Sequence, residues 1–342
     1  MSKAVDLRER RRLQMADIAR LAGVSVSTVS RALNGSSLVN KQTRDRVEEL
    51  AKSLNYTINV SAKNLRLQTN QTVAVVIPYD QRSHQHISDP FFLAMVGALA
   101  DALTDRGLDM LLTRVDAEDL AAAARPYESG RAVGVVLIGQ WRHHDQLNEL
   151  ALRKIPLVVW GAQMPNQIYS TVGGDNVLGG ELGTSHLLKR GRRRLVFLGD
   201  PNLPEVAQRR EGFLRAMSKA GVDVDPRLLV DVPFDQDAAY GAVRDLAPST
   251  GRFDGIVACS DLLALGAIAG LRASGLRVPQ DVSVVGYDNI ALSQFCDPPL
   301  TTIEQPIVAA GERLVESLLL QADGQRATST TVPVRLIERQ SA

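Results

Sequence analysis

The sequence predicts an all-α head followed by an α/β body whose parallel sheets form two lobes. Residues 13–57 place apolar side chains at helical spacing and contain no strand-like run. From Val73 onward, short β-branched runs alternate with Ala- and Leu-rich segments at helical spacing. Such alternation is typical of βαβ units around parallel sheets. Residues 71–342 hold about ten of these units, which favours two lobes over a single sheet.

Each element of the body is predicted from a run of this kind. The predicted strands are 73–77, 133–138, 157–160, 195–198, 256–259, 282–285 and a last core strand at 332–337. The predicted helices between them are 92–103, 181–188, 206–220, 262–273 and 307–320. Ligands of such folds bind at the carboxyl ends of the strands, so a cleft between the lobes is the expected site.

The composition excludes several classes of protein. A chain of 342 residues with 45% hydrophobic residues is not mainly disordered and has room for about two domains. No apolar stretch approaches the ~20 residues of a membrane span, and the charged N-terminus lacks the apolar core of a signal peptide. Two cysteines are too few for a disulfide framework. We expect a soluble cytoplasmic protein without cofactor or metal.

The net charge of +1 hides an asymmetry along the chain. The first 70 residues contain 13 Lys and Arg against 6 Asp and Glu, a net charge of +7, and the rest carries −6. A basic head on an acidic body suggests that the head contacts nucleic acid or a membrane. We divide the chain into a basic tail (1–12), a DNA-binding domain (13–58), a hinge and linker (59–70) and a bilobed body (71–342).

Two short helices joined by a turn are predicted between Met15 and Asn34. Gly23 ends the first helix because glycine tolerates positive φ, and Ser25 is the N-cap of the second. The inner faces are apolar, formed by Ile18, Ala19 and Ala22 and by Val29, Ala32 and Leu33. This arrangement describes a helix-turn-helix. A third helix is predicted from Lys41, with Asn40 as its N-cap and with Val47, Leu50, Ala51 and Leu54 on its inner face.

The outer face of the second helix is small and polar, with Ser27, Thr28, Ser30 and Arg31. Small side chains let a helix enter the major groove, and an arginine can bond a guanine edge in bidentate fashion. The alternative interpretation is a three-helix bundle with a solvated basic face.

The head closely resembles the lactose/galactose repressor family (LacI/GalR). The family pattern DIA-x-x-AGVS-x-x-TVSR-x-LN matches Asp17–Asn34, and TR-x-RV and L-x-Y match 43–47 and 54–56. The resemblance extends from about Leu13 to the end of the chain. It implies a homodimer on double-stranded operator DNA. It also implies DNA contacts from Ser25, Val26, Ser27, Thr28, Ser30, Arg31 and Asn34.

A hinge helix that folds on DNA is also implied, with Asn59 and Lys63 near the minor groove and Leu65 as the side chain wedged between base pairs. The family's usual proline before the hinge asparagine is replaced by Ile58. The arginine-rich tail is interpreted either as solvated and disordered or as a source of phosphate contacts.

The body resembles the sugar-binding folds of periplasmic binding proteins, through stretches such as 89–92, 209–213 and 285–288. The resemblance implies ligand contacts from Phe91, Phe92, Trp141, Arg209, Ser260, Asp288 and Gln305. The two phenylalanines are also candidates for the core, and Trp141 is a candidate for ligand stacking or for core or lid packing. The histidines 84, 86, 143 and 144 are interpreted as solvated loop residues, and the basic run 189–194 as the cap of a helix C-terminus.

These observations favour a transcription regulator, most simply a repressor of carbohydrate-utilisation genes that a small-molecule effector, a saccharide, releases from a pseudo-palindromic operator. The aromatic content of the chain makes a glucoside the candidate sugar. A nucleobase or a protein co-regulator is the alternative to the sugar. A solute-binding receptor would share the body, but the DNA-binding head argues against it. The sequence has no GxxxxGK[ST] loop, GxSxG elbow or HExxH pair, so we expect no enzymatic activity.

Overall fold

The computed structural model describes residues 15–33, 36, 38–54, 70–80, 86–249 and 253–342. The chain divides into two compact units, Met1–Thr69 and Asn70–Ala342. The tail, the hinge residues Asn59, Lys63 and Leu65, and Asn34 lie outside the described residues. No helix within the described ranges combines the length and apolar character that crossing a membrane requires.

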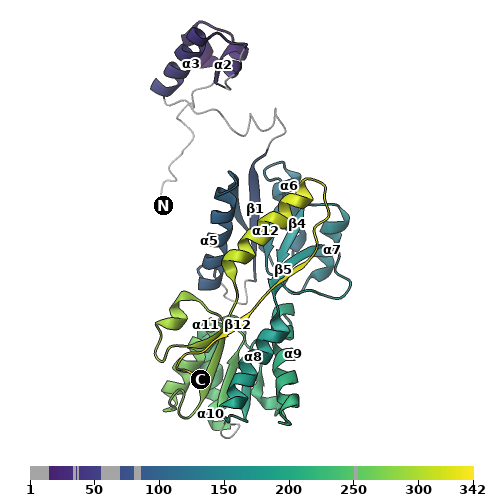
Figure 1. The fold of residues 1–342 in the computed structure, drawn as a ribbon, viewed down its shortest axis with the longest axis vertical. Helices are drawn as coiled ribbons and strands as arrows, with labels where there is room; N and C mark the ends of the chain where they lie inside the picture. Colours follow the sequence, from purple (N-terminus) through teal and green to yellow (C-terminus); the bar gives the residue numbers. More distant parts are fainter. Residues whose placement is uncertain (1–14, 34–35, 37, 55–69, 81–85, 250–252) are drawn as a thin grey trace, which may run out of the picture. The chain divides into compact units, whose positions relative to one another are not determined.

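The first unit is the predicted three-helix head (Figure 1), with α1 (Met15–Ala22), α2 (Val26–Leu33) and α3 (Lys41–Ser53). Ile18, Val29 and Val47, one from each helix, are fully buried and form its small core. The predicted N-cap of α3 is confirmed, because Asn40 Oδ1 accepts a hydrogen bond of 2.8 Å from the Thr43 amide. Gly23 has the predicted positive φ, +63°.

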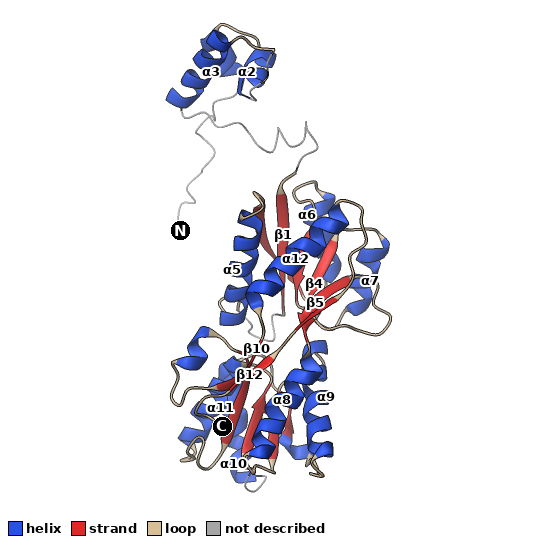
Figure 2. Ribbon diagram, viewed as in Figure 1, coloured by secondary structure: helices blue, strands red, loops and turns tan. Residues whose placement is uncertain are grey.

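The body contains two six-stranded sheets. Helices pack against both sheets, as Figure 2 shows. In the first lobe the strand order is β11-β5-β4-β3-β1-β2, and every pair is parallel. Its elements are β1 (Thr72–Tyr79), α5 (Pro90–Thr104), β2 (Asp109–Asp116), η1 (Leu120–Ala124), α6 (Arg125–Glu128), β3 (Val135–Ile138), α7 (His144–Leu152), β4 (Leu157–Trp160), β5 (Ser170–Gly174), α12 (Ile307–Ala322) and β11 (Thr330–Val332).

Both faces of the first sheet are covered, which explains why its strands read as unbroken apolar runs. Along β1, Val75 and Ile77 pack with residues of α5 and α12, whereas Ala74 and Val76 pack with residues of η1 and α7. The alternate side chains of one strand thus belong to two separate cores.

The second lobe has the strand order β12-β10-β9-β8-β6-β7. Its pairs are parallel except for β10 with β12, which is antiparallel. Its elements are α8 (Asn176–Lys189), β6 (Leu195–Leu198), α9 (Pro204–Lys219), η2 (Pro226–Leu228), β7 (Leu229–Val230), α10 (Gln236–Ser249), β8 (Gly255–Ala258), α11 (Asp261–Ala273), β9 (Ser283–Asp288), η3 (Ala291–Gln294), β10 (Thr301–Glu304) and β12 (Arg335–Ile337). The predicted parallel sheets and bilobed body are confirmed.

The predicted single strand over 332–337 is wrong in one respect. The segment forms two short strands in different lobes: β11 pairs with β5 of the first sheet, and β12 pairs with β10 of the second. Pro333 lies between them and has no amide hydrogen to continue a ladder.

In the described part of the chain, the backbone crosses between the lobes at three places: 174–176, 304–307 and 332–335. These crossovers lie against one another. A Cβ atom at Gly174 would lie 2.8 Å from Gln305 Oε1 and 3.1 Å from Val334 Cγ1. The absence of a side chain at residue 174 therefore lets the three segments pack into one hinge.

Candidate DNA interface and ligand site

Helix α2 has one buried and one exposed face, as a recognition helix requires. Val29 and Ala32 are fully buried, whereas Val26, Ser27 and Arg31 are exposed. The three exposed residues therefore share the face that the sequence analysis assigned to DNA.

Ser25 organises the start of this helix. Its Oγ atom accepts a hydrogen bond of 3.1 Å from the Thr28 amide, which confirms the predicted N-cap. The same atom lies 2.8 Å from Ser27 Oγ and 2.8 Å from Thr28 Oγ1. Ser30 is half-buried. The hydroxyl groups at the helix start are thus linked to one another at the end that enters a groove in helix-turn-helix proteins.

Two arginines of the family-like stretch 43–47 hold the head together. Arg46 Nη2 donates to the Ala22 carbonyl at 2.6 Å, and Arg44 Nη2 donates to the Ser36 carbonyl at 2.7 Å and the Val39 carbonyl at 3.2 Å. These bonds fix the end of α1 and the chain before α3. Arg44 and Arg46 therefore have a structural role that the sequence analysis did not predict.

A cavity of about 660 Å³, part of it open to solvent, lies between the two lobes of the body. It contains six of the seven predicted ligand residues: Phe91, Phe92, Trp141, Arg209, Ser260 and Asp288. Its other lining residues are Asp89, Ile138, Gly139, Trp160, Leu203, Glu205 and Phe234. Gln305 is outside the lining but donates a hydrogen bond of 2.8 Å to Asp288 Oδ1. The sequence thus predicts most of this site.

Arg209 is held rigidly at the floor of the cavity. Its Nε atom donates to Asn176 Oδ1 at 2.9 Å and its Nη1 atom to the Cys259 carbonyl at 2.5 Å. The side chain is 6% exposed. Helix α9, which carries Arg209, packs closely against α8. A Cβ atom at Gly180 of α8 would lie only 2.0 Å from the Arg209 carbonyl oxygen, so the contact requires glycine there. Cys259 is buried.

Asp288 occupies the end of β9 in a conformation that few residues adopt. Its φ is +111° and that of Asn289 is +56°, so two consecutive non-glycine residues lie in the left-handed region. Arg339 donates to Asn289 Oδ1 at 2.7 Å, and Gln305 donates to Asp288 from the hinge. Burial raises the pKa of the Asp288 carboxyl well above its ordinary value, and the nearby Arg209 opposes this rise. The strained turn thus aims a carboxyl at the cavity.

Aromatic side chains line the cavity from both lobes. In the first lobe, the ring centroids of Phe91 and Trp160 are 6.1 Å apart, and Trp141 lies at the carboxyl end of β3. Phe92 lines the cavity but is 5% exposed and belongs to the core, so both interpretations of this residue have support. Trp141 likewise lines the cavity and packs against the core. Phe234 lines the cavity from the second lobe.

Glu205 is a cavity residue that the sequence analysis missed. It lies four residues before Arg209 on α9, so the two side chains share one helix face. Burial raises the pKa of its carboxyl, and its own amide, Arg209 and the Gln140 amide oppose the rise. Acidic residues are favoured in the first turn of any helix, so nothing in the sequence distinguishes this glutamate from a structural one.

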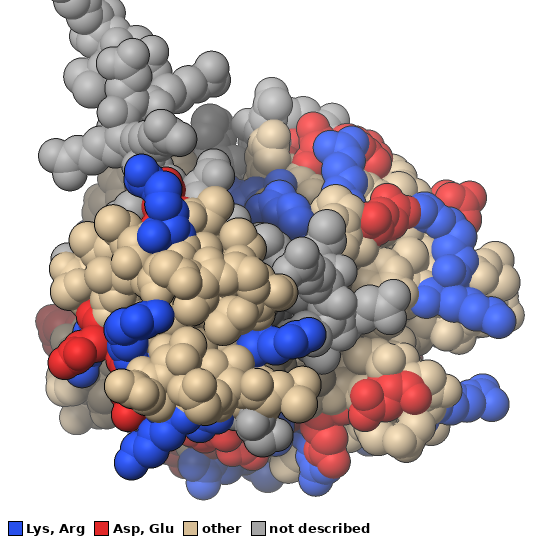
Figure 3. All heavy atoms as spheres, turned by 90° about the horizontal axis from the view of Figure 1, so that it is seen from above, with Lys and Arg blue, Asp and Glu red and all other residues tan. Residues whose placement is uncertain are grey.

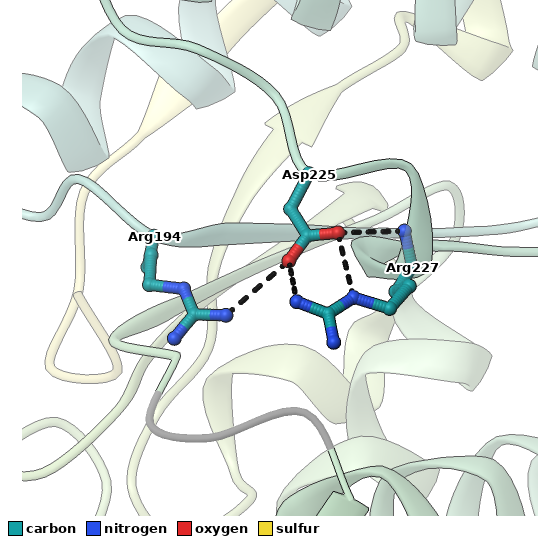
Figure 4. A network of polar contacts seen from close by, with 3 residues as sticks. All are labelled: Arg194, Asp225 and Arg227. Atoms are coloured by element: carbon teal, nitrogen blue, oxygen red, sulfur yellow. Dashed lines mark hydrogen bonds and ion pairs between the residues drawn. The ribbon is translucent and has the colours of Figure 1, made fainter.

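Arginines of the basic run 189–194 bond other groups of the second lobe. Arg193 Nη1 donates to the Leu188 carbonyl at 2.9 Å, which confirms the predicted helix cap. Figure 4 shows Asp225 between Arg194, at 3.3 Å, and Arg227, at 2.7 Å. Hydrogen bonds from Arg227 lower the pKa of Asp225 to about 2. These arginines stabilise a turn of the lobe.

The interpretation of His143 and His144 as solvated loop residues is wrong, because both are half-buried with partners on the first lobe and His144 begins α7. His143 Nε2 lies 2.9 Å from Glu118 Oε2, and His144 Nδ1 lies 2.9 Å from the Tyr169 hydroxyl. Within the part of the chain that the structure describes, no three His, Cys, Asp or Glu side chains are arranged to hold a metal ion. His84 lies outside the described residues.

A helix-turn-helix unit on the same chain as a two-lobed body with an inter-lobe cavity defines a DNA-binding regulator. Comparison with known proteins agrees. Residues 14–59 match the family described as bacterial regulatory proteins, lacI family, and residues 184–342 match the periplasmic binding protein-like domain. The HTH-type transcriptional regulator CelR of Thermobifida fusca is 32% identical, over 97% of each chain. The ribose operon repressor of Haemophilus influenzae is 31% identical, over 89% of this chain and 90% of its own.

Solved structures share this fold. A CelR–cellobiose complex is 30% identical, covers 97% of this chain and all of its own, and superposes with a TM-score of 0.71. The lac repressor dimer bound to operator and the anti-inducer ONPF superposes with a TM-score of 0.84, at 24% identity, over 97% of this chain and 99% of its own. The chain belongs to the lacI family of bacterial regulatory proteins.

Proposed function

We propose that this chain is a transcription repressor that binds a pseudo-palindromic operator as a homodimer and is released by a saccharide bound between its lobes. The inter-lobe cavity carries this proposal. Aromatic rings pack on the apolar face of a sugar ring, and fixed charged side chains bond its hydroxyl groups. Phe91, Trp141 and Trp160 supply the rings, and Arg209 and Asp288 supply the polar partners.

Cellobiose is the first ligand to test, because a CelR structure in complex with it is 30% identical to this chain. The two tryptophans of the chain, Trp141 and Trp160, both line the cavity, so binding should change the intrinsic fluorescence. We expect saturable changes with cellobiose or another neutral saccharide. A response to adenine alone would instead support a nucleobase effector. If neither class produced a response, the effector part of the proposal would be wrong.

The DNA part of the proposal assigns base contacts to Arg31, Ser27 and Val26 on α2. Operator sequences selected from random duplex DNA should be pseudo-palindromic, because a dimer reads two half-sites. An Arg31→Ala variant should lose about 1–3 kcal/mol of specific affinity and keep its affinity for unrelated DNA. Unchanged specific binding would remove Arg31 from the base contacts.

The charge of the head suggests how phosphate contacts are distributed. Seven of its 13 basic residues lie in 1–14 and 55–69, and Arg44 and Arg46 of the remainder bond backbone carbonyls. We propose that the tail and hinge supply much of the phosphate contact. Deletion of residues 1–11 should then reduce the salt slope of binding by about 0.9 per lost phosphate contact. An unchanged slope would favour a tail that makes no contact.

Two further points complete the proposal. The protein acts in the cytoplasm at the bacterial nucleoid, because its target is operator DNA. It is a regulator without enzymatic activity, since its family members are transcriptional regulators and its cavity residues suit binding. A purified sample that converted cellobiose to other sugars would contradict this second point.

A further inference from the structure

The loop after β3 sends three consecutive side chains to three different places. Gln140 is fully buried in the first lobe, where its Nε2 atom donates to the Ala162 carbonyl at 2.7 Å and to the Tyr169 hydroxyl at 2.8 Å. Trp141 lines the cavity. Arg142 points to the second lobe, where it meets Asp200.

The Arg142–Asp200 ion pair joins the lobes at the rim of the cavity. Arg142 Nη2 lies 2.6 Å from Asp200 Oδ2, and the Asp200 side chain is 16% exposed. Asp200 follows β6 and is fixed there, because its Oδ1 atom accepts bonds from the Asn202 amide at 2.9 Å and from Asn202 Nδ2 at 2.7 Å. Burial raises the pKa of Asp200, but the Asn202 and Arg142 bonds outweigh it and leave the pKa below its ordinary value. The carboxylate is therefore ionised and held in place for a charge-assisted bond.

Trp141 lies between these two anchors in a strained conformation. Its φ is +50°, in the left-handed region, and Gly139, two residues earlier, has a φ of +96°. A bulky residue adopts this region only when its surroundings fix it. Gln140 fixes the loop to the first lobe, and Arg142 fixes it to the second.

Two more contacts join the lobes through α9. The backbone N–H of Gln140 donates a hydrogen bond to the Glu205 carboxyl of α9. Gln208 Nε2, also on α9, donates to the Gln163 carbonyl at 2.9 Å. Each joins a first-lobe loop to the start of α9. The hinge of Gly174, Gln305 and Val334 joins the lobes through the backbone, whereas these contacts are side-chain bonds that can break.

We propose that Arg142 and Asp200 form an inter-lobe latch that positions Trp141 against the bound effector, so that effector affinity depends on this ion pair. The inference rests on the proposed effector role of the cavity. Neither residue needs to touch the ligand. Both act through the indole that shares their loop, and they are positioning residues.

The test uses charge exchange in the full-length protein, with cellobiose as the probe and tryptophan fluorescence as the readout. The single variants Arg142→Glu and Asp200→Lys should each weaken cellobiose binding by about tenfold, which corresponds to about 1.4 kcal/mol. The double variant should bind cellobiose more tightly than either single variant, because the pair is restored with its charges exchanged, although the Asn202 bonds to residue 200 are lost. Raising the salt concentration should weaken binding in the parent more than in an Arg142→Ala/Asp200→Ala variant.

A matched pair in the second lobe supplies the control. Arg277 Nε lies 2.9 Å from Asp281 Oδ2, both residues lie outside the cavity lining, and neither links the lobes. The same exchange there should leave cellobiose affinity unchanged. Single latch variants that bind cellobiose as tightly as the parent, or a double variant that folds with the parent's Tm but does not recover, would overturn the proposal.

A ligand-free measurement separates this inference from the effector assignment. In a Trp160→Phe background Trp141 is the only tryptophan, and excitation at the red edge of its absorption band avoids the tyrosines. Each single latch variant should shift its emission to longer wavelength without any ligand, and the double variant should reverse the shift. If the parent bound no saccharide but this pattern held, the effector class would be wrong and the latch would stand. An unchanged emission in both single variants would remove the latch.

Discussion

The guanidinium carbon of Arg209 lies 3.7 Å from the centre of the Tyr287 ring, in a pocket that buries both side chains. The ring covers one face of the guanidinium, while Asn176 and the Cys259 carbonyl hold its edge. A planar cation on an aromatic face, with its donors fixed, is a geometry that lysine cannot reproduce.

We therefore predict that Arg209→Lys weakens cellobiose binding at least tenfold and lowers the free energy of unfolding by about 2 kcal/mol, since hydrogen bonds to charged groups are lost. Fluorescence titration and urea unfolding measure the two effects. Arg210→Lys, one residue along the same helix and outside the cavity lining, is the control. Wild-type affinity in Arg209→Lys would show that the guanidinium does not bind the effector.

The second prediction concerns the contact between α8 and α9. A Cβ atom at Gly212 would lie 2.0 Å from the Val177 carbonyl oxygen. Gly212→Ala should push the helices apart and cost about 3 kcal/mol of stability. Gly241→Ala in α10 is the matched control, because nothing lies within 4 Å of the added atom, and it should be neutral or stabilise by up to about 1 kcal/mol. Thermal unfolding of both variants checks this, and equal Tm values would contradict the close-contact argument.

The third prediction separates two roles of Ser260. Its Oγ atom caps α11 by accepting a 3.2 Å bond from the Leu263 amide, and the residue also lines the cavity. Ser260→Ala should lose about 1 kcal/mol of stability, whereas Ser260→Asn should keep the cap because asparagine is an equally good N-cap. A change of cellobiose affinity in Ser260→Asn at constant Tm would assign the residue to the effector. If Ser260→Ala were as stable as the parent, the cap would be unimportant.

The fourth prediction concerns Asp261, a fully buried carboxyl at the start of α11. Burial raises its pKa to about 7, although Thr302 and the Ile290 amide donate hydrogen bonds to it and Arg339 is nearby. The native state therefore holds a proton that the unfolded chain releases at about pH 4. The resulting stabilisation is complete below that pH and is lost as the pH rises through 7.

Asp261→Asn removes this titration. We expect the free energy of unfolding of the parent, measured against Asp261→Asn, to fall by a few kcal/mol between pH 4 and pH 8, because one pKa unit corresponds to about 1.4 kcal/mol. Urea unfolding at a series of pH values measures it. Parallel pH profiles for the two proteins would mean that Asp261 is ionised throughout this range.

The local features of the head were predictable from sequence because their causes are local. The caps of Ser25 and Asn40 and the left-handed Gly23 depend on residues within one turn. The strands that the sequence predicts are buried on both faces, as in β4. By contrast, β2 is an edge strand with half-exposed side chains, and β5 ends in Gly173 and Gly174, so neither reads as a buried strand.

The cavity was only partly predictable for a different reason. Six of its residues follow from a family resemblance, and their positions at strand and helix ends agree with it. Trp160 ends an ordinary apolar strand, and Glu205 starts an ordinary helix, so neither differs from a structural residue in sequence. The Arg142–Asp200 pair joins residues 58 positions apart on different lobes, and no periodicity connects them.

The positions of β11 and β12 determine when each sheet can be completed during translation. Segment 330–337 supplies an edge strand to each of the two sheets, and α12, which precedes it, packs on α5 near the start of the body. A ribosome that has translated the first 300 residues has therefore produced neither lobe in full. Translation of this one segment completes both sheets almost together, so we expect the ligand site to form only after residue 337 has been made.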